Sequence, residues 1–303
     1  MAAVSIGFKT SPQNVDWPTL DATWARAAEL GVFDSAWLND HITDPAVEHG
    51  GPSWEALTLL AALAHRVPGL TVGHGVLANT FRQPVLVAKA ATLLDHVTGG
   101  RFILGLGAGW HEGEHVPFGI PLPPIRERFD RFESAVGAIK ALFSDAAARG
   151  PGVVRPDPFF PLDGATNLPP PLTPGGPPMW LGGQKKRGLA LVAREGSGWM
   201  LPAIPTYDYD YFADKVDRIH AELASIGRDP AGFAFAAQLP TGKSAEERRA
   251  AVEAGARFAK IGATDLILGM PAGLGPAGIV TVASEVVAPL RDRLGSASAR
   301  IPG

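Results

Sequence analysis

The sequence predicts an α/β protein built as a closed (β/α)8 barrel, the TIM-barrel fold. Short apolar segments alternate with longer helical segments, which is typical of parallel βαβ units. Eight such pairs follow one another along the 303 residues, and this number suits a closed barrel better than an open sheet. The hydrophobic content of 46% is sufficient for a large core.

The eight β-like segments are short and bounded by turn residues. Strands are expected at Val4–Phe8, Ser35–Leu38, Leu70–Leu77, Phe102–Leu106, Met179–Leu181, Gly198–Leu201, Phe233–Ala237 and Leu266–Leu268. Helices are expected at Trp17–Leu30, Trp54–His65, Pro84–Val97, Ile125–Phe143, Lys186–Glu195, Asp208–Ile226, Ala245–Lys260 and Ile279–Leu294. The first helix carries a start and a stop signal, because Pro18 is its second residue and Gly31 follows its last one.

One segment, Ser144–Pro178, interrupts this alternation. It is rich in Pro and Gly and lacks helical periodicity. A long segment without secondary structure inside a compact domain is usually a functional lid or a disordered linker. Because the βα pattern resumes after it, we interpret residues 1–303 as a single domain with an insertion at 144–178, between helix 4 and strand 5. A linker between two domains is the alternative.

Composition and charge exclude several classes of function. The formal net charge of −3 and the single short basic run, Lys185–Arg187, give no reason to expect a nucleic-acid partner. The absence of cysteine excludes disulfides, thiolate metal sites and a cysteine nucleophile. The sequence begins without the features of a signal peptide and has no apolar run of about 18 residues. We therefore expect a cytoplasmic protein without a membrane span that acts on a small molecule.

Reactive groups in such barrels lie on the loops that follow the carboxyl ends of the strands. Asp40 and His41 follow strand 2, where an Asp-His pair can serve as a base or a proton donor because histidine titrates near neutral pH. The alternative for His41 is a polar loop residue without a catalytic role. Arg82, just before helix 3, is interpreted as a structural arginine that pairs with a carboxylate.

Glycines mark strands 3 and 4. Gly73 and Gly75 weaken a strand interior and indicate a bulge or the close approach of a ligand. Strand 4 runs into the glycine-rich segment Gly105–Gly109, which differs from a dinucleotide fingerprint because Trp110 occupies the position of the third glycine and a proline-bearing loop follows. These glycines would instead let a flat ring lie against the backbone.

The segment His111–His115 reads HEGEH and is not the zinc motif HExxH. Its proline-rich surroundings do not support a helix that would hold both imidazoles on a metal, so no metal site is expected. Strand 5 ends in Gly182-Gly183, and a helix follows whose unpaired N–H groups can bind an anion. The basic triplet Lys185–Arg187 would add charge attraction; its alternative interpretation is an exposed polar first turn.

Taken together, these segments resemble the luciferase-like monooxygenase superfamily, and especially its coenzyme F420-dependent oxidoreductase subgroup. The block GRFILGLGAGWHEGEHVPFGIPLPPIRERFDRFESAVGAIKALF, Gly100–Phe143, matches the family pattern almost position for position. The segments LNDHI, GVLANTFRQPVLVAKAATLLDHVTGG and PPMWLGGQKKRGLALVAREGSGW add support. The resemblance runs over most of the chain and is weakest across Asp145–Pro174 and after about Lys260.

The resemblance implies a (β/α)8 barrel with coenzyme F420, or alternatively FMN, at its carboxyl-terminal mouth. Asp40 and His41 match the family's Asp-His near the reactive ring, and Gly75-Val76 matches a bulge where family members carry a non-prolyl cis peptide. The double glycine of strand 5 matches a phosphate-binding turn. The cofactor contacts that follow from this match are Gly75, Val76, Asn79, Gly107, Ala108, Trp110, Gly182, Gly183, Gln184, Lys185, Lys186 and Arg187.

The resulting hypothesis is hydride transfer between C5 of the deazaflavin F420 and a small organic acceptor, such as an activated C=C or C=N bond. His41, oriented by Asp40, would supply or remove the proton, while the cofactor carries the redox chemistry. An FMN-dependent monooxygenase that activates oxygen is the alternative. A third hypothesis, from another class, is a non-catalytic barrel that merely binds a flavin.

Two departures from the sugar-phosphate dehydrogenase branch argue against glucose-6-phosphate as substrate. That branch has a glutamate where this chain has Trp110, and a tryptophan where this chain has Thr43-Asp44-Pro45. The substrate pocket is expected to be shaped by the loop Thr43–Pro52 and by the insertion Ser144–Pro178. A homodimer is the family's common assembly, although the sequence itself indicates no interface.

Overall fold

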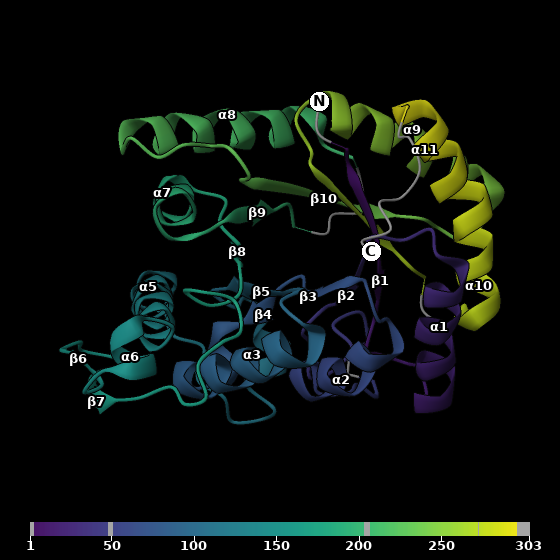
Figure 1. The fold of residues 1–303 in the computed structure, drawn as a ribbon. Helices are drawn as coiled ribbons and strands as arrows, with labels where there is room; N and C mark the ends of the chain where they lie inside the picture. Colours follow the sequence, from purple (N-terminus) through teal and green to yellow (C-terminus); the bar gives the residue numbers. More distant parts are fainter. Residues whose placement is uncertain (1–2, 48–50, 203–206, 272, 296–303) are drawn as a thin grey trace.

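Parallel strands form a closed ring at the centre of the structure (Figure 1). The structure is a computed structural model that describes residues 3–47, 51–202, 207–271 and 273–295. Within these residues the ring contains eight strands, and it closes because β3 pairs with β5 and β11 pairs with β1. The strands are β1 (Ser5–Thr10), β2 (Ser35–Leu38), β3 (Thr71–His74), β5 (Phe102–Gly107), β8 (Met179–Leu181), β9 (Gly198–Met200), β10 (Ala234–Pro240) and β11 (Asp265–Gly269). The predicted (β/α)8 barrel is therefore confirmed.

Helices surround this ring (Figure 1). The long ones are α1 (Trp17–Leu30), α2 (Ala56–Leu63), α3 (Pro84–Thr98), α5 (Ile125–Leu142), α7 (Lys186–Glu195), α8 (Tyr209–Ser225), α9 (Ala245–Lys260), α10 (Gly275–Val282) and α11 (Ala288–Leu294). A π-helical turn, Ala283–Val287, joins the last two. None of the helices in the described part of the chain combines the length and the apolar character that a membrane crossing requires.

The local signals of the sequence place α1 as expected. Its N-cap is Asp16, whose side chain accepts a hydrogen bond of 2.8 Å from the amide of Thr19. Gly31 ends the helix in the left-handed conformation, with φ of 63°. Helix α2 begins at Ala56, two residues later than expected at Trp54, because the side chain of Glu55 accepts from the amides of the first turn and fixes the start there.

The third strand is divided. β3 ends at His74, and a two-residue strand, β4 (Leu77–Ala78), continues beside β5 after the cis peptide bond Gly75–Val76. Gly73 pairs with Ile103, and Leu77 pairs with Leu106, so four steps along this strand correspond to three along β5. One residue is therefore extra, as in a β-bulge, and the bulge expected from the glycines is present.

Aromatic side chains fill the interior of the ring. Trp37 and Trp180 stack with ring centroids 5.0 Å apart, and Met200 packs with them. A Cβ at Gly73 would lie 2.6 Å from the ring of Trp37, closer than van der Waals contact allows. Gly73 therefore makes room for a tryptophan and not for a ligand, and any cavity must lie above this layer.

The insertion between α5 and β8 differs from the expectation. It contains a short helix, α6 (Asp145–Arg149), and an antiparallel ribbon of β6 (Val153–Arg155) and β7 (Leu162–Ala165), which lie beside α5 (Figure 1). Its later part is bonded to α3, since Thr173 donates to the buried carboxylate of Asp95 through both its amide and its hydroxyl. A segment that joins the end of a helix to the start of a strand lies at the amino-terminal ends of the strands. The insertion is therefore an ordered segment at the end of the barrel opposite the carboxyl-terminal mouth.

Candidate functional site

A cavity of about 670 Å³ lies at the carboxyl ends of the strands. Its lining comes from the ends of β1, β2, β4, β5, β8, β9 and β10, from a short helix, α4 (Glu112–His115), and from the first turns of α5 and α7. Cavities of about 300–1,000 Å³ are typical of small-molecule and cofactor sites. This is also the face at which barrel enzymes carry their reactive groups.

Most of the residues predicted from the sequence line this one cavity, including both His41 and the glycine turn after β8. The predicted residues in the lining are Asp40, His41, Gly75, Val76, Gly107, Ala108, Trp110, Gly182, Gly183, Gln184, Lys185 and Arg187. Asn79 and Lys186 are not among the lining residues. Asn79 instead begins a 3-10 turn after β4, and Lys186 is an exposed residue at the start of α7.

The cis peptide bond Gly75–Val76, expected from the resemblance, is part of the cavity wall. Gly75 is packed from below by Met200, because a Cβ at Gly75 would lie 2.7 Å from the Met200 sulfur. Val76 reaches the other way, and its Cγ2 would lie 3.8 Å from a Cβ at Gly182. The bulge thus contacts both Met200 on β9 and the glycine turn after β8.

The glycines of β5 have a packing role that the sequence did not reveal. A Cβ at Gly105 would lie 1.8 Å from the carbonyl oxygen of His74, and one at Gly107 would lie 2.8 Å from Val76. The space beside these glycines is therefore filled by the bulge itself. The expectation that they let a flat ring approach is corrected for Gly105, whereas Gly107 also lines the cavity.

His41 is held by a carboxylate from the segment after β5. Its Nδ1 lies 2.7 Å from Oε2 of Glu114, whose other oxygen accepts from the amide of Ile42 at 2.8 Å. Burial alone would raise the pKa of Glu114, but the hydrogen bond and positive charge of His41, together with the nearby amides, hold the pKa below its usual value. An ionised carboxylate only accepts, so Nδ1 carries the hydrogen and Nε2 is left for a bound molecule.

Asp40 has a different partner. Arg82 donates two hydrogen bonds to its carboxylate, at 2.7 and 2.8 Å, and the amide of Ala78 donates a third. Arg82 also pairs with Glu55, which confirms its interpretation as a structural arginine. The expectation that Asp40 orients His41 is corrected: its oxygens are engaged by Arg82 and β4, so it anchors the end of β2 to the bulge.

Two further histidines lie near Glu114. His111 Nδ1 is 3.7 Å from the same carboxylate, and His111 lines the cavity. His115 is buried and is bound to the carbonyl of His111 and the hydroxyl of Thr80. Among the described residues, no group of three or more His, Cys, Asp or Glu side chains is arranged to hold a metal ion.

The other end of the cavity can bind an anion. Gly183 packs directly against Gly188 in the first turn of α7, since a Cβ on Gly183 would lie 2.8 Å from the Gly188 backbone. The helix has no side-chain N-cap, so its first amides are available to an anion. Lys185 is exposed in the lining, whereas Arg187 is held by Asp130 and Glu133 on α5.

Sequence reasoning assigned no role to several polar residues of the cavity, among them Glu114, Arg126, Lys9 and Gln238. Glu114 lies within the recognised block but was assigned no role, and Arg126 is an exposed cation in the first turn of α5. Lys9 on β1 and Gln238 on β10 also line the cavity and are hydrogen-bonded to each other. A signal existed for this last pair, because a lysine and a glutamine follow the apolar middle residues of the strands SIGFKT and AFAAQLP.

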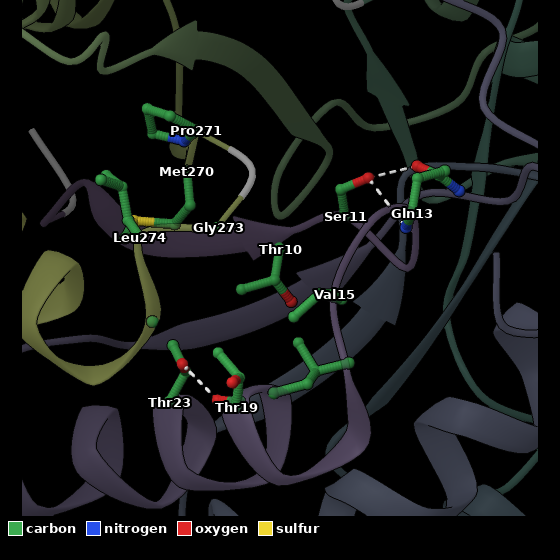
Figure 2. A pocket seen from close by; sticks show the side chains of 12 residues that line it. Thr10, Ser11, Gln13, Val15, Thr19, Thr23, Met270, Pro271, Gly273 and Leu274 are labelled. Carbon is green, nitrogen blue, oxygen red and sulfur yellow. Dashed lines mark hydrogen bonds between the residues drawn. The ribbon is translucent and has the colours of Figure 1, made fainter. Parts of the chain in front are cut away.

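The loop Thr43–Pro52 and the insertion Ser144–Pro178 were expected to shape the pocket. None of the insertion's residues is in the lining, nor are the described residues of the loop; residues 48–50 lie outside the described part of the chain. A second hollow, between α1, the end of β1 and the segment before α10, has a volume of only about 30 Å³ (Figure 2). A hollow of this size has room for about two water molecules and is too small for a cofactor.

Comparison with known proteins identifies the family of the chain that forms this cavity. A family model described as luciferase-like monooxygenase matches residues 14–291. The chain belongs to the luciferase-like monooxygenase family. The resemblance to this superfamily is therefore confirmed, and an F420-dependent relative that is 30% identical confirms the resemblance to the F420-dependent subgroup.

Curated relatives of this luciferase-like chain are oxidoreductases by name. A phthiodiolone/phenolphthiodiolone dimycocerosates ketoreductase of Mycobacterium tuberculosis (strain ATCC 25618 / H37Rv) is 30% identical over 258 residues, which are 78% of this chain and 65% of the relative. The chain thus spans about 65% of the length of that ketoreductase. An F420-dependent glucose-6-phosphate dehydrogenase of Kribbella flavida is 30% identical over 243 residues, 75% of this chain and 71% of the relative.

Solved structures share the fold of this luciferase-like chain. An F420-dependent secondary alcohol dehydrogenase in complex with an F420-acetone adduct superposes with a TM-score of 0.81 at 19% identity, covering 96% of this chain and 100% of the other. A long-chain alkane monooxygenase superposes with a TM-score of 0.78 at 16% identity, covering 100% and 94%. At these identities the likeness supports the barrel alone.

Proposed function

We propose that this protein transfers a hydride between coenzyme F420 and a carbonyl or secondary alcohol group of a predominantly apolar substrate. The observation that carries the proposal is the His41–Glu114 pair at the wall of the cavity. Reduction of a carbonyl adds a hydride at carbon and a proton at oxygen, so the site needs a proton donor that faces the substrate. An imidazole whose Nδ1 is fixed by a buried carboxylate offers its Nε2 for this purpose.

The residues of the cavity suit a long cofactor with a planar ring and a phosphate. The amides at the start of α7, together with Lys185 and Arg126, would hold the phosphate and any acidic extension beyond it. The wall formed by Gly75 and Val76 would support the ring. When bound, F420 would supply or accept the hydride.

The protein's own residues would then perform three tasks. His41 would donate a proton to the substrate oxygen during reduction, or remove it during oxidation, while Glu114 keeps the imidazole in place. Trp110 and Ile125 would cover the substrate, since both are apolar, line the cavity and are 68% and 63% exposed. Covering the site excludes water and strengthens the electrostatic effect of the His41–Glu114 pair.

The names of similar proteins support a carbonyl–alcohol reaction. Both a ketoreductase and a secondary alcohol dehydrogenase act at this type of carbon, and the latter was solved with an adduct of F420 and acetone. Glucose-6-phosphate fits less well, because this chain has Trp110 and the segment Thr43-Asp44-Pro45 where the sugar-phosphate branch carries a glutamate and a tryptophan. The apolar rim favours a ketone or alcohol with a hydrocarbon substituent.

Cofactor titration tests the proposal. Purified protein is titrated with F420 and with FMN, each oxidised and reduced, while cofactor fluorescence is followed. We expect binding of F420, and then oxidation of reduced F420 in the presence of an apolar ketone without oxygen consumption. Binding of reduced FMN alone, with oxygen uptake, would replace the proposal with the monooxygenase alternative. Binding without turnover of any ketone, alcohol, alkene or imine would leave the non-catalytic barrel.

A further inference from the structure

Lys9 is a cation on the floor of the cavity that the proposed mechanism does not use. Along β1, Ile6 and Phe8 belong to the core between the strands and the helices. Because side chains alternate along a strand, Lys9 points to the opposite face, into the ring of strands. It is only partly exposed, and it lines the cavity. Its exposed surface therefore faces the space in which a ligand would lie.

Among the described residues, the ammonium of Lys9 has one hydrogen-bond partner, the neutral amide of Gln238. Its Nζ donates to Gln238 Oε1, and the Gln238 Nε2 donates to the carbonyl of Leu201 at 2.8 Å, which fixes the orientation of the amide. No carboxylate lies within ion-pair distance of Lys9 among the described residues. An ammonium has three donors, so two of them remain for other acceptors.

The surroundings make this cation costly without a further acceptor. Burial lowers the pKa of Lys9 to about 8, which reflects the loss of hydration around the charge. A buried charge is stabilised chiefly by hydrogen bonds and opposite charge, and the neutral Gln238 provides only one such bond. An oxygen of a bound molecule would satisfy the remaining donors.

The place of Lys9 indicates which part of a ligand it meets. Its partner atom, Gln238 Oε1, would lie 3.9 Å from a Cβ at Gly75, whereas the bulge residue nearest to a Cβ at Gly182 is Val76, at 3.8 Å. Lys9 is on β1 and Lys185 follows β8, and these strands lie four positions apart in the ring of eight, so the cavity has a cationic group on each of two opposite sides: Lys9 on one, and Lys185 with the start of α7 on the other. A molecule whose phosphate binds at α7 and whose ring lies over the wall extends its far edge toward Lys9.

We propose that Lys9, positioned by Gln238, binds a carbonyl oxygen on the pyrimidinedione edge of the planar ring of the cofactor. This inference rests on the proposed function, because it assumes a ring supported by the Gly75–Val76 wall. F420 and FMN both carry this edge, so Lys9 recognises the feature that the two rings share. The distinction between the two cofactors then depends on other parts of the cavity.

The test compares ligand affinities in variants with and without the cation. Lys9→Met removes the charge at similar length, Lys9→Gln keeps an N–H donor without the charge, and Lys260→Met, an exposed lysine on α9, is the matched control. Dissociation constants are measured for F420, for FMN, and for riboflavin, which carries the ring without the phosphate. Thermal unfolding of each variant verifies folding, and Lys9→Met is expected to unfold no lower than the wild type because a buried charge is removed.

We expect Lys9→Met to weaken the binding of F420, FMN and riboflavin by about tenfold or more, which is the range of a hydrogen bond to a charged group. The dissociation constants of FMN and riboflavin should rise by the same factor. Lys185→Ala, in contrast, should weaken the binding of the phosphorylated ligands only. The affinities of Lys9→Gln should lie between those of the wild type and Lys9→Met, and the affinities of Lys260→Met should match those of the wild type.

The midpoint potential of FMN bound to the protein provides a second readout that does not depend on activity. A positive charge at the pyrimidinedione edge stabilises the reduced, electron-rich ring, so the potential should be more negative in Lys9→Met. Equal affinities and an equal potential in the wild type and Lys9→Met would overturn this inference alone. If the wild type binds neither F420 nor FMN, the proposed function fails, and the inference fails with it.

Discussion

At the residue scale, the identity of the group that holds His41 decides how the site works. The sequence neighbour Asp40 has both oxygens engaged by Arg82, while Glu114, 73 positions after His41, contacts the imidazole. The Glu114 side chain is only 2% exposed, so water competes little for the hydrogen bond. Glu114 is therefore a positioning residue, and His41 is the residue that would meet the substrate.

Glu114→Gln tests this arrangement. The amide can still contact His41 but does not enforce the same tautomer, so kcat should fall, by at most the roughly 10²- to 10⁴-fold that a positioned acid or base contributes. Cofactor affinity should be unchanged, and a solvent deuterium isotope effect on kcat should appear or grow as proton transfer becomes slower. Both are measured with F420 and a ketone that the wild type reduces.

A matched control is Glu127→Gln, which alters a partly exposed carboxylate that pairs with Arg131 on α5. Its kinetics should equal those of the wild type. A Glu114→Gln enzyme with normal kcat and no isotope effect would show that His41 does not depend on this carboxylate.

At the element scale, the mouth of the barrel depends on how closely β5 approaches the bulge after β3. The glycines of β5 allow this approach, since a Cβ at Gly105 would lie 1.8 Å from the carbonyl oxygen of His74. A backbone contact cannot be relieved by rotation of a side chain. The strand and the bulge therefore have to move apart if Gly105 is replaced.

Gly105→Ala should accordingly lower the free energy of unfolding by roughly 1–3 kcal/mol, the usual range for overpacking of a core, and should weaken cofactor binding because the bulge forms the cavity wall. Chemical denaturation and a cofactor titration measure the two effects. Gly269→Ala on β11 is the control, because a Cβ there has no neighbour closer than 3.6 Å. Equal stability of the two variants would contradict this packing role.

The elements themselves follow from local signals in the sequence, whereas the site follows from tertiary contacts. The ends of α1, α7 and α9 are where capping residues and periodicity predict them. Glu114 could not be linked to His41 from the sequence, because the contact joins the segments after two strands that are not neighbours in the ring. The role of Gly73 was likewise hidden, since it depends on Trp37 in the adjacent strand.

The insertion illustrates the same limit. Its proline and glycine content suggested a lid, yet composition does not specify on which rim a segment lies. Connectivity does: the segment leaves α5 and enters β8, so it lies at the rim opposite the cavity. This argument from connectivity was available from the sequence, and it would have excluded a role in the mouth.

At the scale of the whole molecule, a buried histidine beneath the site should make stability depend on pH. His74, the last residue of β3, is fully buried; its Nε2 lies 3.1 Å from the carbonyl of Ala56 on α2, and its Nδ1 has no partner among the described residues. Burial lowers the pKa of His74 from 6.5 to about 4, although the bond to Ala56 and the charge of Asp40 oppose the shift. The folded protein therefore holds this side chain neutral.

The sign of the effect follows from proton uptake. Between pH 6.5 and about 4 the unfolded chain binds a proton at His74 and the folded protein does not, so acid favours unfolding. The contribution of neutral His74 to the free energy of unfolding is fully present above pH 6.5 and is lost as the pH falls toward 4. The total loss is on the order of 3 kcal/mol. The pKa of Glu55 and that of Asp157 are lowered to about 2, so these groups act mainly below this range.

Denaturant unfolding between pH 7 and pH 4.5 measures the effect, and His74→Gln separates it from that of other groups. A glutamine can keep a donor to the carbonyl of Ala56 but does not titrate, so the loss of stability toward pH 4.5 should be clearly smaller in His74→Gln than in the wild type. His65→Gln, which replaces an exposed histidine after α2, should retain the wild-type slope.

Because His74 adjoins the bulge at Gly75, acid protonation should also open the cavity wall, and cofactor affinity should decline over the same interval in the wild type. If the free energy of unfolding and the cofactor affinity change with pH in the same way in the wild type and in His74→Gln, then His74 is not the group whose protonation destabilises the barrel and its cavity wall.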